Sequence, residues 1–222
     1  MWCIPQVGAD FVACMEDILD LYAEPYDPKR PLVCFDEMPK QLIAETRQAW
    51  PTQPGQVRRY DYEYERRGVR NVWMFFEPLA GQRRVRITRQ RTKQDWAQAM
   101  QWLADVLYPD AACIRVVLDN LNTHTIAALY ETFEPAEANR LRRRFEFHYT
   151  PKHGSWLNMA EIELSVFERL AWAGPIPDEE TLRHNTRLRE AERNAQQATV
   201  NWQFTSQTAR VKLRRLYPSI SD

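Results

Sequence analysis

The stretch RFEFHYTPKHGSWLNMAEIELSVFERL (residues 144–170) contains two regular elements joined by a turn. Its first part, FEFHY (residues 145–149), is rich in aromatic residues and predicts a short strand. Residues 159–170 place apolar side chains at helical spacing after a Gly-Ser pair and predict a helix. Glu161 falls in the first turn of that helix, where the helix dipole favours a negative charge. The stretch therefore predicts a strand, a turn and a helix that begins with an acid.

Two further strands are predicted upstream, and each ends at an acid. The apolar run PLVCF stops at Asp36, and the run CIRVVL stops at Asp119. Acids at the carboxyl ends of strands in an open α/β sheet point into the crevice where ligands bind. Three carboxylates brought together repel one another unless a cation lies between them. Asp36, Asp119 and Glu161 therefore predict a site for Mg²⁺ or Mn²⁺, and two such ions suit displacement at phosphorus.

Each acid also has a purely structural interpretation. An Asp after a strand is often a turn or a helix cap, and a Glu in a first helical turn is often a capping residue. Glu163 competes with Glu161, but it lies about 200° further around the helix, so only one of them faces the site. Glu37 competes with Asp36, but in a strand it points to the opposite face. Ile162 is expected to begin the core stripe of this helix.

The remaining chain predicts a mixed α/β layout around one sheet. No Ser- or Gly-rich linker interrupts it, so we expect one domain. In chain order we expect a helix at 10–22, a loop with room for one helical turn at 38–56, a hairpin of strands 69–77 and 83–88, a helix at 96–107, helices within 126–133 and 135–144, a polar helix at 181–197 and a final segment at 212–217.

Composition excludes several classes of protein. The chain has 222 residues, of which 44% are hydrophobic and 12% aromatic, so it can build a core and is not disordered throughout. No apolar run is long enough to cross a membrane, and the first ten residues do not resemble a secretory signal. The four cysteines, at positions 3, 14, 34 and 113, match no zinc motif, and we expect them to be reduced in a cytosolic context.

The formal net charge is zero, but the charges alternate in blocks. Residues 1–37 and 94–139 are acidic, whereas 56–93 and 182–215 are basic. Such a chain can fold into an acidic pocket rimmed by basic surfaces, as a metal site beside a polyanion requires. Ordinary solvated helices and strands give the same pattern.

Four segments carry a resemblance to a known family. They resemble the bacterial insertion-sequence branch of the mariner-type DDE transposases, over about residues 3–218. The resemblance implies a ribonuclease-H-like catalytic domain that uses two divalent ions, Mg²⁺ or Mn²⁺. Such a domain cuts DNA at the ends of the element and joins the freed 3′-OH to target DNA. The segments are CFDEMPKQL (34–42), VVLDNLNTHT (116–125), RFEFHYTPKHGSWLNMAEIELSVFERL (144–170) and WQFTSQTARVKLRRLYP (202–218).

Mapped onto this sequence, the family's catalytic and metal-binding triad is Asp36, Asp119 and Glu161. The family places its third acid three residues after the Asn of a Leu-Asn pair, here Asn158, and this selects Glu161 over Glu163. The spacing between the second and third acids is wider than in the best-known animal members, and we assign the surplus to the helical stretch 126–144.

The resemblance also predicts domains and partners. We expect a linker helix at 1–30, the ribonuclease-H-like core at 31–175 and a C-terminal helical extension of the same domain at 176–222. The expected partners are transposon-end and target DNA and a second copy of the chain on that DNA, with no membrane. Relatives begin with helix-turn-helix modules, so such a module could be a separate N-terminal part. We expect a cytoplasmic, nucleoid-associated protein.

Several residues are candidate DNA contacts. Lys152 suits a phosphate, and basic side chains can track the DNA backbone. Trp156 can stack on a splayed base, although a core anchor is the more common role of such a residue. His148 is expected to be half-buried, and a zinc site with His153 is rejected because no cysteine is near. The full candidate set is Asn120, His124, Arg142, Arg143, Arg144, Lys152, His153 and Trp156.

The loop after the second acid has two interpretations. Asn120, Asn122 and His124 can orient an attacking water or the scissile phosphate, or they can form a hydrogen-bonded loop that caps the next helix. Two alternatives to a transposase also stay open at this point. One is a catalytically silent truncated copy that binds DNA or dimerises, and the other is a nuclease of the same fold that cuts without joining.

Overall fold

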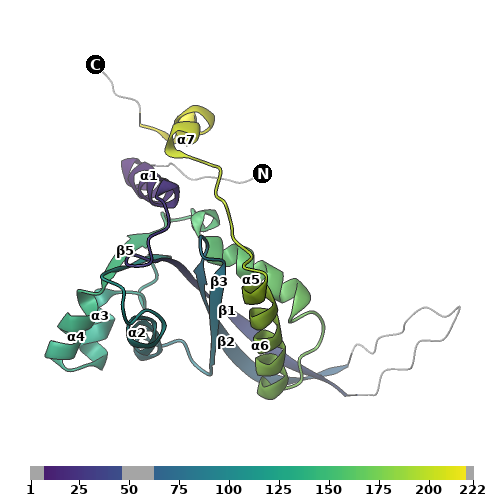
Figure 1. Ribbon diagram of the computed structural model, residues 1–222. Coiled ribbons are helices and arrows are strands. Elements are labelled where there is room, and N and C mark those ends of the chain that lie inside the picture. The colour runs from purple at the N-terminus through teal and green to yellow at the C-terminus, as the bar shows by residue number, and fades with distance from the viewer. Residues whose placement is uncertain (1–7, 47–62, 219–222) are drawn as a thin grey trace, which may run out of the picture.

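The computed structural model describes residues 8–46 and 63–218, which are built around a five-stranded mixed sheet (Figure 1). The strand order is β3-β2-β1-β4-β5. β1, β2 and β3 pair antiparallel, and β4 and β5 run parallel to β1. This is the mixed α/β architecture that the sequence predicts. The strands are β1 (Leu32–Glu45), β2 (Tyr64–Glu77), β3 (Gln82–Thr88), β4 (Ile114–Leu118) and β5 (Phe145–Tyr149).

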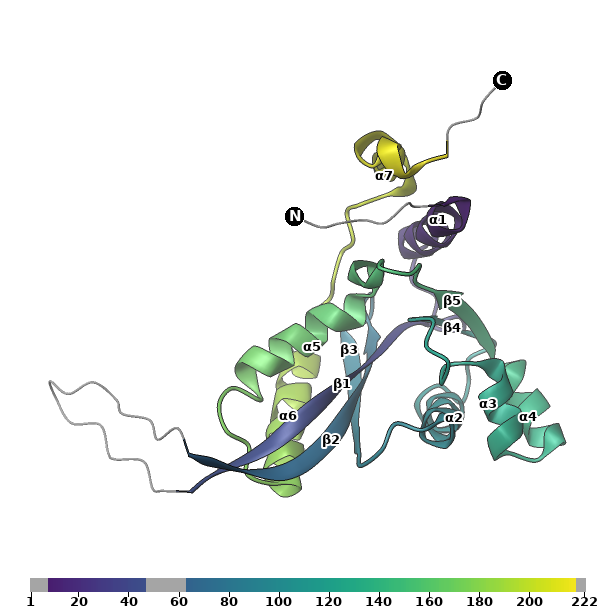
Figure 2. The same ribbon diagram turned by 180° about the vertical axis from the view of Figure 1, so that it is seen from behind.

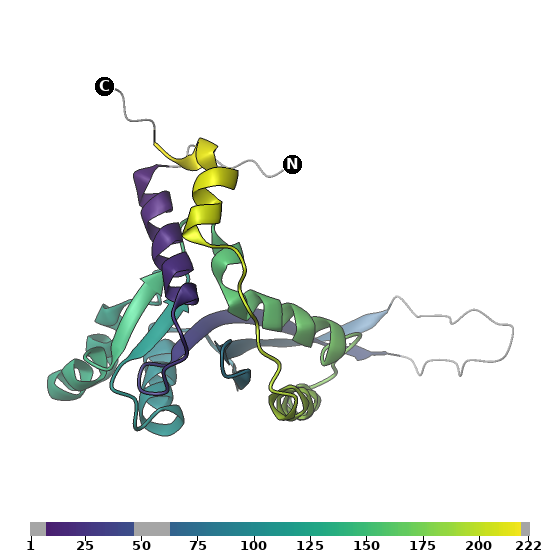
Figure 3. The same ribbon diagram turned by 45° about the horizontal axis from the view of Figure 1, so that its top comes forward.

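Helices cover both faces of the sheet (Figure 2). One core contains residues of α1, α5, α6 and α7, and the other contains residues of α2, α3 and α4. α1 and α7 lie side by side although they come from opposite ends of the chain (Figure 3). In the described ranges no helix is both long and apolar enough to cross a membrane. The helices are α1 (Ala9–Ala23), α2 (Lys93–Trp102, continued by a π-helical turn at Leu103–Leu107), α3 (Ile126–Thr132), α4 (Pro135–Arg142), α5 (Met159–Leu170), α6 (Glu179–Ala195) and α7 (Ser206–Lys212), with 3-10 turns at Ser155–Leu157 and Arg214–Leu216.

The alternation of side chains along β1 positions the two acids that follow its apolar run. Leu32 and Cys34 belong to the core under α5, whereas Val33 and Phe35 belong to the core under α2. Because successive strand residues point to opposite faces, Asp36 continues the α5 side and the next residue continues the α2 side. The strand therefore sends two neighbouring carboxylates to two different environments.

β1 is longer than the sequence predicts. Residues 38–45 were expected to be loop, but they continue the strand and pair with β2. Pro39 is tolerated there because β4 pairs with β1 only at residues 32–34, which leaves Pro39 with a strand on one side only. The rest of the predicted loop, at 47–56, and residues 57–62 lie outside the described residues.

The buried face of α5 also differs from the expectation. Ile162 does not begin the core stripe, because it is 40% exposed. The buried positions of the helix are Met159, Ala160, Glu163, Leu164 and Phe167. A charged residue takes the place of an apolar one in this stripe, and its partners, described below, explain how it can be buried.

Candidate active site

α5 is fastened to β1 by the side chain of Asn158. Its Oδ1 accepts a hydrogen bond from the backbone N–H of Ala160 and so caps the helix. Its Nδ2 donates to the carbonyl of Phe35 over 2.8 Å, in the interior of the protein. The first turn of α5 is therefore held beside the strand residue that precedes Asp36. Sequence analysis treated Asn158 only as a landmark of the family, although its capping residue type was a signal for this role.

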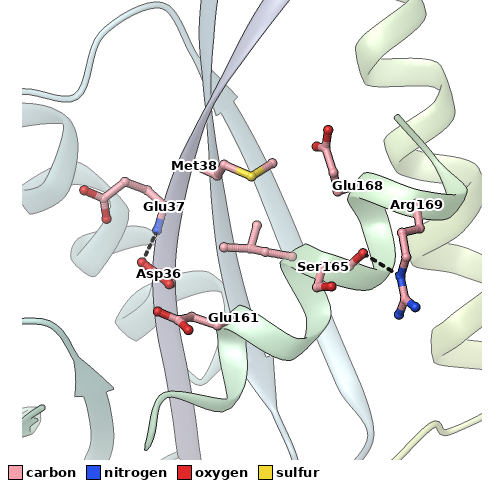
Figure 4. A pocket seen from close by; sticks show the side chains of 8 residues that line it. Asp36, Glu37, Met38, Glu161, Ser165, Glu168 and Arg169 are labelled. Carbon is pink, nitrogen blue, oxygen red and sulfur yellow. Dashed lines mark hydrogen bonds between the residues drawn. The ribbon is translucent and has the colours of Figure 1, made fainter. Parts of the chain in front are cut away.

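Asp36 and Glu161 line one open pocket of about 360 Å³ between β1 and α5. Figure 4 shows their carboxylates facing each other, while Glu37 points to the other side of the strand. Asp36 Oδ1 also accepts a hydrogen bond from the backbone N–H of Glu37 at 2.8 Å. The remaining lining residues are Glu37, Met38, Leu164, Ser165, Glu168 and Arg169.

The carboxylates of this site repel one another. Burial is the main cause that raises the pKa of Asp36 to about 7; the charges of Glu37, Glu161 and Asp119 act in the same direction, and the backbone hydrogen bond opposes them. Within the described ranges, neither Asp36 nor Glu161 forms an ion pair with a basic side chain. A divalent cation would relieve this repulsion, and oxygen-only donors suit Mg²⁺ or Mn²⁺. Asp36, Asp119 and Glu161 therefore fit the metal that the sequence predicts.

The second acid, Asp119, is held by a buried histidine. His124 Nδ1 lies 2.6 Å from Asp119 Oδ1, and His124 Nε2 lies 3.2 Å from Glu37 Oε2. The side chains of His124 and Glu37 are 1% and 2% exposed, whereas that of Asp119 is 34% exposed. Burial lowers the pKa of His124, but the hydrogen bond to Asp119 and the contact with Glu37 outweigh it and raise the pKa to about 9.

Glu37, Asp119 and His124 also offer ligand atoms within 4.8 Å of one another. The two carboxylates contact opposite nitrogens of one imidazole ring, and a single ion cannot bind both nitrogens of the same ring. The contacts therefore describe a histidine bridging two acids. Sequence analysis named Glu37 only as a rival of Asp36, and no local pattern showed that it meets His124.

Glu163 lies on the other side of α5 and is fully buried. Arg193 donates to both of its oxygens, at 2.6 and 2.8 Å, and Arg83 Nε lies 3.2 Å away. Two basic side chains thus compensate this carboxylate, and it does not line the pocket. The structure separates the two competing glutamates: one faces the pocket and the other closes a buried ion-pair network.

Lys152 and His153 are exposed and follow the carboxyl end of β5. Leu118, just before Asp119, pairs with Tyr149 at that end, so the turn lies at the same sheet edge as the acids. The turn is closed by a 2.7 Å hydrogen bond from the Gly154 N–H to the Pro151 carbonyl. His153 takes a φ of 67°, which non-glycine residues adopt rarely. Both candidate DNA contacts are therefore presented on an ordered turn near the acids.

The basic run that precedes β5 lies elsewhere. Arg142 and Arg143 are exposed, but they come before the start of β5, at the sheet edge opposite Asp119. Arg144 donates to the carbonyl of Tyr108 at 2.7 Å and to that of Ala104 at 3.3 Å, and so satisfies the end of the π-helical turn. Asp119 follows the carboxyl end of β4, and β5 runs parallel to β4. Residues that precede β5 therefore lie at the end of the strands that is far from Asp119.

The structure shows the surroundings of three further candidates, His124, Trp156 and His148. His124 is not a DNA contact in this structure, because its side chain is in the interior. Trp156 packs beside Trp202, with ring centroids 6.5 Å apart, which is the core role that sequence analysis favoured for it. His148 is half-buried, as expected, and its ring nitrogens lie 2.7 Å from Asp17 and 3.1 Å from a second acid.

The loop after β4 is open to solvent at its start. Asn120 and Asn122 are exposed directly beyond Asp119, whereas the loop turns inward at His124. The two asparagines are therefore available to a ligand at the acids. Thr125 is the N-cap residue of the next helix, α3, but its side chain makes no capping hydrogen bond.

Solved structures of similar fold include several complexes of the Mos1 transposase. The chain matches the Mos1 mariner paired-end complex with Mn at a TM-score of 0.58 and 13% identity, over 89% of this chain and 61% of that one. It matches a pre-cleavage Mos1 transpososome at 0.57 and 12%, over 89% and 64%, and the Mos1 strand transfer complex at 0.54 and 12%, over 90% and 65%. The chain thus spans less than two thirds of the Mos1 chains, and the likeness shows a shared ribonuclease-H-like fold.

Sequence comparison gives the family. No curated protein matches the chain. A family model described as DDE superfamily endonuclease matches residues 31–183, which is more than half of the chain and includes Asp36, Asp119 and Glu161. With acids gathered at one edge of a sheet of this fold, and with that match, the chain belongs to the DDE superfamily of endonucleases.

Proposed function

We propose that this chain is the catalytic domain of a DNA transposase. It cleaves DNA at transposon ends and joins the freed 3′-OH to target DNA. The observation that carries the proposal is the cluster of Asp36 and Glu161 in an open pocket, with Asp119 near enough to raise the pKa of Asp36. Among the described residues, no basic side chain forms an ion pair with Asp36 or Glu161. Carboxylates that repel one another without a neutralising partner destabilise the fold, and a purely structural role does not explain why they are kept.

In this proposal Asp36, Asp119 and Glu161 hold two divalent ions. Bound there, such ions activate the attacking oxygen and stabilise the leaving oxygen of an in-line displacement at phosphorus. In cleavage, the oxygen of water bonds to phosphorus and the bond to the 3′ oxygen breaks, which leaves a 3′-OH and a 5′-phosphate. In joining, that 3′-OH replaces water and displaces a 3′ oxygen of the target strand.

The rest of the chain positions DNA. Lys152 and His153 lie at the sheet edge of the acids and suit the phosphates next to the cut, beside Asn120. Arg142 and Arg143 suit only DNA that extends to the opposite edge. Two DNA ends must be brought together, so we propose a homodimer on DNA in the cytoplasm, at the nucleoid. Recognition of the ends would come from a helix-turn-helix part.

Metal binding and DNA cleavage test the proposal together. We expect the chain to bind Mn²⁺ in calorimetry, to nick a supercoiled plasmid in Mn²⁺ or Mg²⁺, and to join an oligonucleotide 3′-OH to that plasmid. Asp119→Asn should abolish all three. Absence of Mn²⁺ binding both with and without DNA would favour a catalytically silent fragment, whereas nicking without joining would favour a nuclease of the same fold.

A further inference from the structure

We infer that Glu37 and His124 are positioning residues that hold Asp119 in the orientation required for metal binding. The inference rests on the proposed function and deepens it. It starts from a contact between three residues that sequence analysis did not connect: a carboxylate, an imidazole and a second carboxylate in line.

Glu37, His124 and Asp119 form a linear array, and Asp119 is the end of the array that is exposed to solvent. Its Oδ1 is 2.6 Å from His124 Nδ1, and within residues 8–46 and 63–218 its side chain has no other hydrogen-bond or ion-pair partner. A carboxylate only accepts, so Nδ1 donates and Oδ1 is occupied. Oδ2 is left for an ion. A metal ligand held through one atom by a buried neighbour is the usual arrangement by which proteins orient such ligands.

His124 itself cannot turn. Its ring packs edge-on against Phe35, with centroids 5.3 Å apart, and stacks on Trp96 at 6.1 Å. The hydroxyl of Tyr149 donates to its backbone carbonyl at 3.1 Å. An imidazole so enclosed presents Nδ1 in one direction, which is the direction of Asp119.

Glu37 completes the array on the far side of the ring. Its Oε2 is 3.2 Å from His124 Nε2, and its Oε1 is 3.8 Å from the exposed Arg91. Neither Glu37 Oε2 nor His124 Nε2 has a hydrogen-bond partner among the described residues, so the contact is electrostatic. A buried carboxylate is costly unless an opposite charge accompanies it. Glu37 therefore belongs with His124 and holds the ring between two acids.

Two substitutions of His124 separate positioning from packing. An Asn amide can replace Nδ1 and keep the donor to Asp119, whereas a Gln amide reaches the place of Nε2 and loses that donor. We expect His124→Gln to weaken Mn²⁺ binding, measured by calorimetry with the metal alone, by about 10- to 100-fold. We expect His124→Asn to stay much closer to the native affinity. A packing role predicts the reverse, because Gln fills more of the space than Asn.

The melting temperature of each variant shows whether it folds. Equal losses in two folded variants, with a native chain that binds Mn²⁺, would overturn the inference and leave the proposed function standing. A native chain that neither binds Mn²⁺ nor cleaves DNA would overturn both. If the His124 variants do not fold, Glu37→Gln decides, because it keeps the shape of the side chain. We expect it to weaken Mn²⁺ binding several-fold, and an unchanged affinity would refute the array.

Discussion

The acids on the two sides of α5 differ in how their negative charge is compensated: Glu163 lies on one side, and Asp36 and Glu161 on the other. Glu163 is buried against Arg83 and Arg193, so its charge is compensated and its position is fixed. Asp36 and Glu161 face a pocket open to solvent, without a basic partner among the described residues. The two glutamates are only two residues apart in the sequence.

The difference separates acids that build the protein from acids that bind something else. A compensated carboxylate stabilises the fold, and its removal leaves the buried Arg83 and the partly buried Arg193 without this partner. An uncompensated cluster destabilises the fold until a cation arrives, which is typical of binding sites. The comparison predicts opposite effects of mutation on activity and on stability in the two groups.

Glu161→Gln should have the largest effect on activity. Because stabilisation of charge by bound ions is worth several kcal/mol, we expect Mn²⁺-dependent nicking to fall at least about 1000-fold. Asp36→Asn and Asp119→Asn should behave alike. The melting temperature without metal should not fall in Glu161→Gln. Glu168→Gln, an exposed acid of the same helix and pocket, is the matched control and should nick normally.

Glu163→Gln should have the largest effect on stability. Breaking a buried ion pair on one side costs about 3–5 kcal/mol, which corresponds to a fall in melting temperature of about 10 °C in a chain of this size. Nicking measured well below that temperature should stay within about tenfold of native. If Glu163→Gln is inactive while folded and Glu161→Gln is active, the assignment of the two acids is reversed.

Asn158→Ser should disturb the geometry between the two elements that carry Asp36 and Glu161. Ser still caps α5 but is too short to reach the carbonyl of Phe35. Because a misplacement of about 1 Å can cost about 100-fold in rate, we expect nicking to fall by about 10- to 100-fold. Asp178→Ala is the control, because it removes the N-cap of α6, which lies away from the pocket. We expect it to lower the free energy of unfolding by about 1 kcal/mol and to leave nicking unchanged.

The free energy of unfolding should depend on pH because of the uncompensated acids around Asp36. The pKa of Asp36 is raised from 3.8 to about 7, so the folded chain holds this proton more tightly than the unfolded chain does. The stability of the metal-free chain should therefore fall as the pH rises from about 4 to about 7. Asp36→Asn should flatten part of this slope and raise the melting temperature at pH 7. A steeper slope in the variant would contradict the assignment.

Lys152→Ala should have the smallest effect, on DNA binding alone. Loss of one phosphate contact lowers the slope of log affinity against log salt by about 1. Arg142→Ala, at the opposite sheet edge, should leave the slope unchanged on a short duplex. Fluorescence anisotropy of a labelled duplex across a salt series measures both. A larger change in the Arg142 variant would place the DNA along the other edge.

Much of this architecture could be predicted because it depends on local patterns. The apolar runs before Asp36 and Asp119 and the helical spacing after Asn158 are short-range signals, and the elements they predict are present. The extension of β1 past Pro39 could not be predicted, because it depends on β1 pairing there with β2 on one side while its pairing with β4 on the other side has already ended. Proline reads as a strand breaker unless its neighbours are known.

The amino-acid sequence alone determined the fold class, the family and the elements that carry Asp36, Asp119 and Glu161, although the strand that carries Asp36 continues to Glu45. It could do so because periodicity and motif spacing are properties of neighbouring residues. Only the tertiary structure decided which face of α5 carries the buried Glu163, which sheet edge holds Lys152, and that Glu37 meets His124 across β1. Those facts depend on contacts between residues 30 to 111 positions apart, such as Glu163 with Arg193 and Arg83 with Asn194, which no local pattern encodes.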